Sequence, residues 1–170
     1  MVKIHIFGGP GSGKTTLASK LFVELKIPHY DLDFFRYKEE DTNYTLCEDE
    51  EVRDKKLKKV ISKKSWITEG SYSDFAWPCF EKADIIIVLE PNLFVSNYRI
   101  LKRFLHHKLG IKKRPKPERW RNLPGLLKWS HVVTYKKLPL MKERLKPISH
   151  KVIYLKKNFD FDELIIRIKK

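Results

Sequence analysis

Nine residues near the N-terminus, Gly8 to Thr16, are of the types and spacing that can hold phosphate. The first eight, Gly8 to Thr15, match the pattern G-x-x-x-x-G-K-[ST] without a mismatch. Glycines let the backbone bend so that successive N–H groups point at an anion, beside the positive end of a helix dipole. The pattern places the Lys14 ammonium at the β- and γ-phosphates and the Thr15 hydroxyl on Mg²⁺. We therefore predict a nucleoside triphosphate site made by Gly8, Gly9, Pro10, Gly11, Ser12, Gly13, Lys14, Thr15 and Thr16.

The residues on either side of this loop are those of a strand and a helix. The apolar run from Val2 to Phe7 predicts a buried strand, and residues 16–25 place apolar side chains at helical spacing. Such a strand and helix are the context that the motif requires. The alternative is a glycine-rich turn that happens to precede a helix, and the complete motif with both flanks argues against it.

Beyond the loop, the chain alternates predicted strands and helices. Further strands are predicted at residues 27–32, 65–68, 84–90 and 151–155. Helices are predicted at residues 48–63, 74–82, 91–108, 123–145 and 161–168, with a break or bend at Pro78 and interruptions near Pro124-Gly125 and at Pro139. The run of β-branched residues at 85–88 is typical of a strand buried on both faces. We therefore expect one α/β domain over residues 1–170, a P-loop NTPase fold with a five-stranded parallel sheet and helices on both faces.

Carboxylates stand where two of these strands end, and ligands bind beyond the carboxyl ends of the strands in such sheets. Glu69 follows strand 65–68, and we assign it to Mg²⁺, partly through water. Asp33 follows the second strand, and we assign it a catalytic role in orienting or deprotonating the acceptor of the phosphoryl group. Asp31 is the reserve candidate there, and Arg36 and Gly70 are expected around the same acceptor. Helix capping or a structural salt bridge is the alternative role of each acid.

Phosphoryl transfer also needs cations, because charge on the transferring group must be neutralised. Arg99 and Arg103 are four residues apart on the predicted helix 91–108, so one face carries both, and we assign both to catalysis. The segment at about 104–122 is rich in Lys, Arg and Pro and predicts a basic lid over ATP. Arg114 in this lid, and Asn158 after the last strand, are expected to bind the nucleotide. A solubilising surface is the alternative role of these arginines.

Positive charge is concentrated in one third of the chain. The formal net charge is +15, and residues 91–150 hold 16 Lys and Arg but only two acids, Glu118 and Glu143. The remaining residues hold 20 basic and 19 acidic side chains and are nearly neutral. Such a patch is expected to face polyanions, either the phosphates of small ligands or nucleic acid, whereas a solvated surface usually mixes both signs.

Cysteine usage and hydropathy favour a soluble, cytoplasmic protein. Cys47 and Cys79 are the two cysteines, and their separation argues against a disulfide framework or a zinc site. The N-terminal apolar run leads at once into the glycine loop and does not resemble a signal peptide. No apolar run approaches the roughly 20 residues of a membrane-spanning helix.

Several stretches together resemble the topology-modulation proteins, small P-loop proteins related to adenylate and shikimate kinases. They are Gly8–Ala18, Tyr30–Asp33, Trp66–Ser73, Ala83–Leu89, Arg99 and Arg103. The resemblance implies a nucleoside-monophosphate-kinase-like fold with five parallel strands. Where family members usually have Asp-Gly-Asn-Tyr, this chain has Glu69 to Tyr72, so its carboxylate is one methylene longer. The family is named for an effect on DNA supercoiling, so the resemblance implies no particular substrate.

Two functions of different classes follow. The first is a kinase that transfers the γ-phosphoryl group of Mg-ATP to a small acceptor, either a nucleotide or another hydroxyl or phosphate compound. The second is a nucleic-acid-associated ATPase that uses the basic segment 91–150, whose aromatic residues could stack on bases. These aromatic residues, which could equally pack the lid against the sheet, are Trp120, Trp129, His131 and Tyr135. No helix-turn-helix, zinc-finger or RNA-binding signature is present, so we favour the kinase and regard nucleic acid as the less favoured partner.

Overall fold

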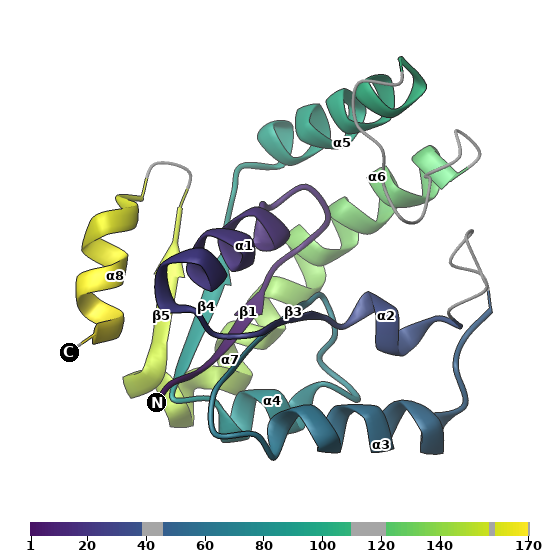
Figure 1. Ribbon diagram of the computed structural model, residues 1–170. Helices are drawn as coiled ribbons and strands as arrows, with labels where there is room; N and C mark the ends of the chain where they lie inside the picture. The colour runs from purple at the N-terminus through teal and green to yellow at the C-terminus, as the bar shows by residue number, and fades with distance from the viewer. Residues whose placement is uncertain (39–45, 110–121, 157–158, 170) are drawn as a thin grey trace.

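The computed structural model describes residues 1–38, 46–109, 122–156 and 159–169 (Figure 1). One five-stranded sheet has the strand order β2-β3-β1-β4-β5, and every neighbouring pair is parallel. The strands are β1 (Lys3–Phe7), β2 (His29–Asp31), β3 (Trp66–Gly70), β4 (Ile85–Leu89) and β5 (Val152–Leu155). The predicted parallel sheet is confirmed.

Helices connect the consecutive strands, and one more helix, α8, follows the last strand (Figure 1). They are α1 (Lys14–Leu25), α2 (Asp33–Arg36), α3 (Glu50–Ile61), α4 (Trp77–Lys82), α5 (Leu93–Lys108), α6 (Leu123–Val132), α7 (Leu138–Leu145) and α8 (Phe161–Lys169). A π-helical turn, Val133–Lys137, joins α6 to α7, and a 3₁₀ segment, Lys146–Lys151, leads into β5. None of the described helices is long and apolar enough to cross a membrane.

Each face of the sheet has its own hydrophobic core. On one face α1 and α8 pack against the strands, with buried residues that include Ile4, Ile6, Leu17, Leu21, Leu164 and Ile168. On the other face α3, α4 and α7 pack, with buried residues that include Phe7, Leu57, Trp66, Phe80 and Leu145. Full burial of one such side chain contributes about 1.5–3 kcal/mol. The prediction of helices on both faces is therefore confirmed.

The register brings the ends of three strands together. Phe7 of β1 pairs with Gly70 of β3, and Asp31 of β2 pairs with Glu69 of β3. The loop after β1 and the acids after β2 and on β3 therefore lie at one edge of the sheet. This edge is the one at which α/β folds bind ligands.

The predicted effects of two prolines are wrong. Pro78 and Pro124 lie in the first turns of α4 and α6, where proline costs no helical hydrogen bond because the first N–H groups have no partner within the helix. Pro78 therefore begins α4 and does not break it. Residues 123–145 form a continuous helical path, in which the π-helical turn Val133–Lys137 interrupts the α-helix directly before Pro139.

The predicted lid lies mostly outside the described residues. Residues 104–108 belong to α5, and Asn122 directly precedes α6. Residues 110–121, including Arg114, lie outside the described part of the chain, as does Asn158. The lid and the roles of these two residues stay predictions.

Candidate active site

The glycine loop has the backbone that its sequence predicts. Gly11 and Gly13 have φ values of +71° and +99°, in the left-handed region that favours glycine. A Cβ on Gly11 would also lie 2.4 Å from the backbone oxygen of Ser96, so α5 approaches the loop as closely as glycine permits. The Lys14 Nζ donates a hydrogen bond to the Gly9 carbonyl at 3.2 Å. The ammonium is thus held over the loop.

Glu69 contacts the loop residue that is expected to hold Mg²⁺. The Thr15 Oγ1 donates to Glu69 Oε1 at 2.6 Å, and the Lys14 Nζ lies 4.0 Å from Glu69 Oε2. Burial alone would raise the pKa of Glu69, but contacts with His29, Lys14 and Thr15 outweigh it and hold the pKa below its usual value. A carboxylate that is 1% exposed and still ionised is an oxygen ligand of the kind Mg²⁺ prefers.

His29 is a neighbour of Glu69 that the sequence did not identify. Its Nε2 lies 3.7 Å from Glu69 Oε1, an ion-pair separation too long for a hydrogen bond, and this nitrogen is otherwise buried without a partner. The alternation of side chains along β2 could have identified His29 from the sequence, because residues two apart on a strand share a face. His29 therefore shares a face with Asp31, which pairs with Glu69.

Asp31 shapes the turn into α2. Its Oδ1 accepts a hydrogen bond from the Asp33 backbone N–H at 2.9 Å, which agrees with the capping alternative for this residue. Burial, followed by the charges of Asp33 and Glu69, raises the pKa of Asp31 to about 7. The acid beside the loop on β2 is therefore partly protonated near neutral pH.

This raised pKa predicts a pH dependence of stability. The folded protein keeps a proton on Asp31 that the unfolded chain releases above about pH 4. Between about pH 4 and pH 7 the stability that depends on Asp31 therefore falls as the pH rises. Because Asn cannot ionise but keeps the accepting oxygen, Asp31→Asn is expected to stabilise the protein at about pH 8 by on the order of 1–2 kcal/mol.

Urea unfolding of wild type and variant, at about pH 5 and about pH 8, measures this difference. The gain in the free energy of unfolding from Asp31→Asn should be small at the lower pH, where Asp31 is protonated in the folded protein. An equal gain at both pH values would show that burial of the ionised form is not the cause.

The predicted acceptor side is a hydrogen-bonded group around Asp33. The Tyr72 hydroxyl donates to Asp33 Oδ1 at 2.6 Å. Burial, followed by the charge of Asp33, raises the pKa of Tyr72, so the phenol keeps its proton. The Arg36 guanidinium lies 5.9 Å from the ring centre of Tyr72 and 3.9 Å from Asp74 Oδ2. The sequence did not single out Tyr72 for this role.

Gly70 packs against Tyr72 and Leu32, and its carbonyl accepts a hydrogen bond from the Gly8 N–H at 3.4 Å. A Cβ at Gly70 would lie 3.1 Å from the Tyr72 ring and 3.2 Å from Leu32, so a larger residue would displace the neighbours of Asp33. The next residue, Ser71, donates its hydroxyl to the Gly8 carbonyl at 2.7 Å. These contacts join β3 to the glycine loop, and contact of Gly70 with an acceptor stays a prediction.

Of the two predicted catalytic arginines, Arg99 reaches the glycine loop. Its Nη1 donates to the Ser12 carbonyl at 3.1 Å and to the Gly11 carbonyl at 3.4 Å. Arg103 lies one turn further along α5 and is half-buried, and its catalytic role stays a prediction. The close packing of α5 on Gly11 explains how a helix distant in sequence delivers Arg99 to this place.

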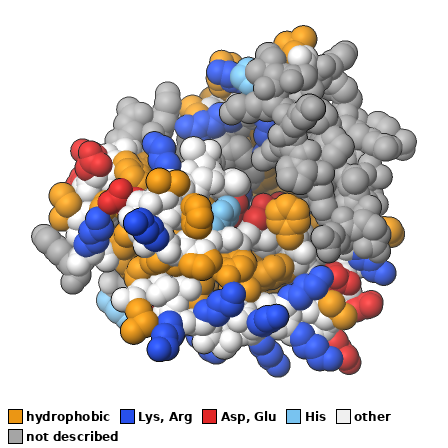
Figure 2. All heavy atoms as spheres, viewed as in Figure 1, with side chains coloured by type: hydrophobic (Ala, Val, Ile, Leu, Met, Phe, Trp, Pro, Cys, Tyr) orange, Lys and Arg blue, Asp and Glu red, His pale blue; other side chains and the backbone are white. Residues whose placement is uncertain are grey.

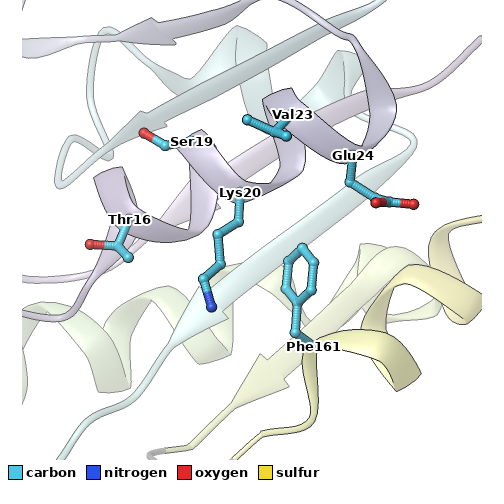
Figure 3. Close-up of a pocket in the computed structure, with 6 residues that line it drawn as sticks. All are labelled: Thr16, Ser19, Lys20, Val23, Glu24 and Phe161. Carbon is cyan, nitrogen blue, oxygen red and sulfur yellow. The ribbon is translucent and has the colours of Figure 1, made fainter.

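A cavity of about 620 Å³ adjoins α1 and the start of α8 (Figure 3). Its lining residues are Thr16, Ser19, Lys20, Val23, Glu24 and Phe161. The Lys20 ammonium lies 5.3 Å from the centre of the Phe161 ring. Thr16 belongs to the glycine loop, so the cavity begins where the loop passes into α1. Figure 2 shows a further hollow on this face, with acidic and histidine side chains near its centre.

Comparisons with known proteins identify the fold. No protein-family model matches the chain, and no curated protein sequence matches it. Among solved structures, a candidate kinase from Chloroflexus aurantiacus is 18% identical with a TM-score of 0.61, covering 99% of this chain and 96% of its own. A gluconokinase from Sinorhizobium meliloti is 12% identical with a TM-score of 0.54, covering 98% and 89%. A shikimate kinase from Bacteroides thetaiotaomicron is 16% identical with a TM-score of 0.50, covering 99% and 94%.

These likenesses extend over nearly the whole chain. They do not single out the topology-modulation proteins, so membership of that family stays a prediction. The chain has the α/β fold of small P-loop kinases.

Proposed function

We propose that the protein is an ATP-dependent kinase that transfers the γ-phosphoryl group to a small acceptor. The observation that carries the proposal is the arrangement of Lys14, Thr15 and Glu69 at the end of the glycine loop, with Thr15 Oγ1 2.6 Å from the Glu69 carboxylate. The similarity to solved structures called kinases supports it. The predicted adenylate-kinase-like activity on a nucleotide is one form of this proposal.

The residues at this site fit Mg²⁺. Among the described residues no group of three or more His, Cys, Asp or Glu could hold a metal by itself, so the ion would share protein oxygens with phosphate and water. Thr15 Oγ1 would be a direct ligand, and Glu69, ionised and buried, would hold a bound water. Mg²⁺ would neutralise phosphate charge during transfer.

The other residues have separate tasks in this proposal. The loop N–H groups and Lys14 bind the phosphates, and the Lys14 ammonium stabilises charge on the transferring group. Arg99 holds the carbonyls of Gly11 and Ser12, so it fixes the loop beside that group. Asp33 is on the acceptor side, where its carboxylate orients or deprotonates the acceptor.

The test is an ADP-release screen of nucleoside monophosphates and small metabolites, with Mg²⁺ and ATP, with and without duplex DNA. Acceptor-dependent ADP release is expected for at least one small compound. Stimulation by DNA alone would instead support the nucleic-acid-associated ATPase. Product analysis by phosphorus NMR then distinguishes transfer to the acceptor from hydrolysis.

A charge comparison separates these two functions further. Arg99→Ala is expected to lower turnover by roughly tenfold to a hundredfold, because the glycine loop loses its contact with α5. Lys128→Ala, which removes an exposed cation of α6, is the matched control and should change turnover less than about twofold. Fluorescence anisotropy with duplex DNA at two salt concentrations gives the second readout. Tight DNA binding that both substitutions weaken equally, with normal turnover, would contradict the kinase proposal.

A further inference from the structure

The helix α5 carries an exposed stripe of large apolar side chains. Phe94, Tyr98, Leu101 and Leu105 are 83%, 62%, 41% and 50% exposed. They follow one another at helical spacing, so they share one side of α5 over a length of about 17 Å. Leu109, directly after α5, is 69% exposed and continues the stripe. Soluble proteins rarely leave such a contiguous apolar patch in water unless it binds something.

This stripe lies on a different face of α5 from the one that packs on the protein. Ser96, Ile100 and Phe104 are buried, and they follow one another at intervals of one turn. The buried face includes the approach of Ser96 to Gly11 in the glycine loop. Figure 1 shows α5 along the upper edge of the molecule. The stripe is therefore a ridge on the outside of the fold, separate from the contact with the glycine loop.

The charge of α5 is exclusively positive. Residues 93–108 include Lys and Arg side chains and no Asp or Glu. Lys102 is exposed, and its ammonium lies 6.0 Å from the centre of the Tyr98 ring, at the border of the stripe. The helix also lies within the basic segment 91–150, which holds 16 Lys and Arg and two acids. A surface that binds α5 must therefore accept apolar side chains and carry negative charge.

These two requirements select among the candidate occupants of the stripe. A second copy of the chain would bring two basic helices together, and like charges repel each other. The phosphates of nucleic acid would pair with the cations but would leave the leucines in water. A bilayer that contains anionic lipids accepts both kinds of side chain, because apolar groups enter the acyl boundary and cations stay at the headgroups. It also needs no groove shaped to fit a ridge.

We propose that the exposed face of α5 docks the protein on an anionic lipid membrane, with the helix in the plane of the interface. Phe94, Leu101 and Leu105 enter the boundary between headgroups and acyl chains to a depth of about 5–10 Å. The Tyr98 ring lies at the level of the headgroups, and Lys102 extends its ammonium to the lipid phosphates. This inference does not depend on the proposed kinase function.

Sedimentation with lipid vesicles tests the docking with the full chain. Binding is measured on vesicles of phosphatidylcholine alone and on vesicles of phosphatidylcholine mixed with phosphatidylserine. Binding to the mixed vesicles is expected to be roughly tenfold tighter or more, and to weaken as salt is added. Equal binding to the two compositions, or binding to neither, would overturn the inference.

Leu105→Glu tests the apolar stripe, because it places a charge where contact with acyl chains is expected. Binding to the mixed vesicles should fall by roughly tenfold or more, and Phe94→Glu at the other end of the stripe should have the same effect. Ile166→Glu is the matched control, since Ile166 of α8 is 56% exposed and the change in charge is the same. This control should weaken binding by less than about threefold.

Thermal unfolding shows whether these three variants remain folded. If Leu105→Glu and Ile166→Glu weakened binding equally, net charge alone would explain the attraction and the role assigned to the stripe would be wrong. Sedimentation equilibrium without lipid provides a further check. A dimer of the wild type that Leu105→Glu dissociates would identify a second copy of the chain as the occupant, against the inference.

A nitroxide label shows which surface meets the lipid. The label is placed on Leu105→Cys in a Cys47→Ser background, in which the remaining cysteine, Cys79, is buried. On the mixed vesicles the label should be accessible to oxygen dissolved in the bilayer and shielded from a water-soluble nickel complex. A label that stays in water on the bound protein would show that another surface makes the contact.

Discussion

Replacement of Lys14 by alanine is expected to lower phosphoryl transfer by about a hundredfold or more while the protein remains folded. The Lys14 Nζ lies 3.2 Å from the Gly9 carbonyl and 4.0 Å from Glu69 Oε2, so its charge is fixed at the place where phosphate charge would develop. An interaction that strengthens in the transition state affects kcat more than it affects substrate binding. Steady-state measurement of ADP release over a range of ATP concentrations separates the two.

The control for this variant is Lys142→Ala. Lys142 also lies beside a carboxylate, with its Nζ 2.8 Å from Glu90 Oε1, but it belongs to α7. Its removal should leave kcat within about twofold of the wild type. If a folded Lys14→Ala protein also turned over ATP at a near-normal rate, the assignment of the glycine loop as the phosphate site would be wrong.

The second large effect is expected for Asp33→Asn. Loss of a general base typically costs about a hundredfold to ten-thousandfold in rate, and Asn cannot take a proton from the acceptor. ATP binding should survive, because the proposed function assigns Asp33 to the acceptor side and the phosphates to the glycine loop. Calorimetric ATP titration and acceptor-stimulated ADP release give the two readouts.

Glu69→Gln is the comparison that makes this assignment specific. The Glu69 carboxylate contacts Thr15 in the wild type, so the variant should need a higher Mg²⁺ concentration for half-maximal activity and should still respond to the acceptor. The two variants are compared in a Mg²⁺ titration, with and without the acceptor. Identical profiles would show that the two acids do not have separate roles.

Local sequence patterns were sufficient for the main features of the fold. The glycine loop has backbone angles that only glycine adopts easily, and the β-branched run of β4 lies inside the sheet between β1 and β5, so both are encoded within a few residues. The effects of the prolines in α4 and α6 were predicted wrongly for a related reason. A proline forbids a helix interior and favours a first turn, and sequence alone did not show which of the two applied.

Only part of the candidate site could be predicted from local sequence patterns. Asp33 and Glu69 could be named because they end strands, and Arg99 because of its spacing on a helix. Tyr72 can be identified only when distant segments meet, since it is 39 residues from Asp33. His29 could have been identified from the alternation of β2, because it shares a strand face with Asp31. Glu69, whose side chain is one methylene longer than the Asp of the resembled family, accepts a hydrogen bond from the Thr15 hydroxyl at 2.6 Å, and its role toward Mg²⁺ stays a prediction.

The close approach of α5 to Gly11 has a mechanical consequence. The backbone oxygen of Ser96 occupies the space that a side chain on Gly11 would need, and Arg99 donates hydrogen bonds to two carbonyls of the same loop. We therefore expect the loop and α5, which is about 24 Å long for its 16 residues, to move together. A small rotation at the phosphate site would then displace the far end of α5 by a larger distance.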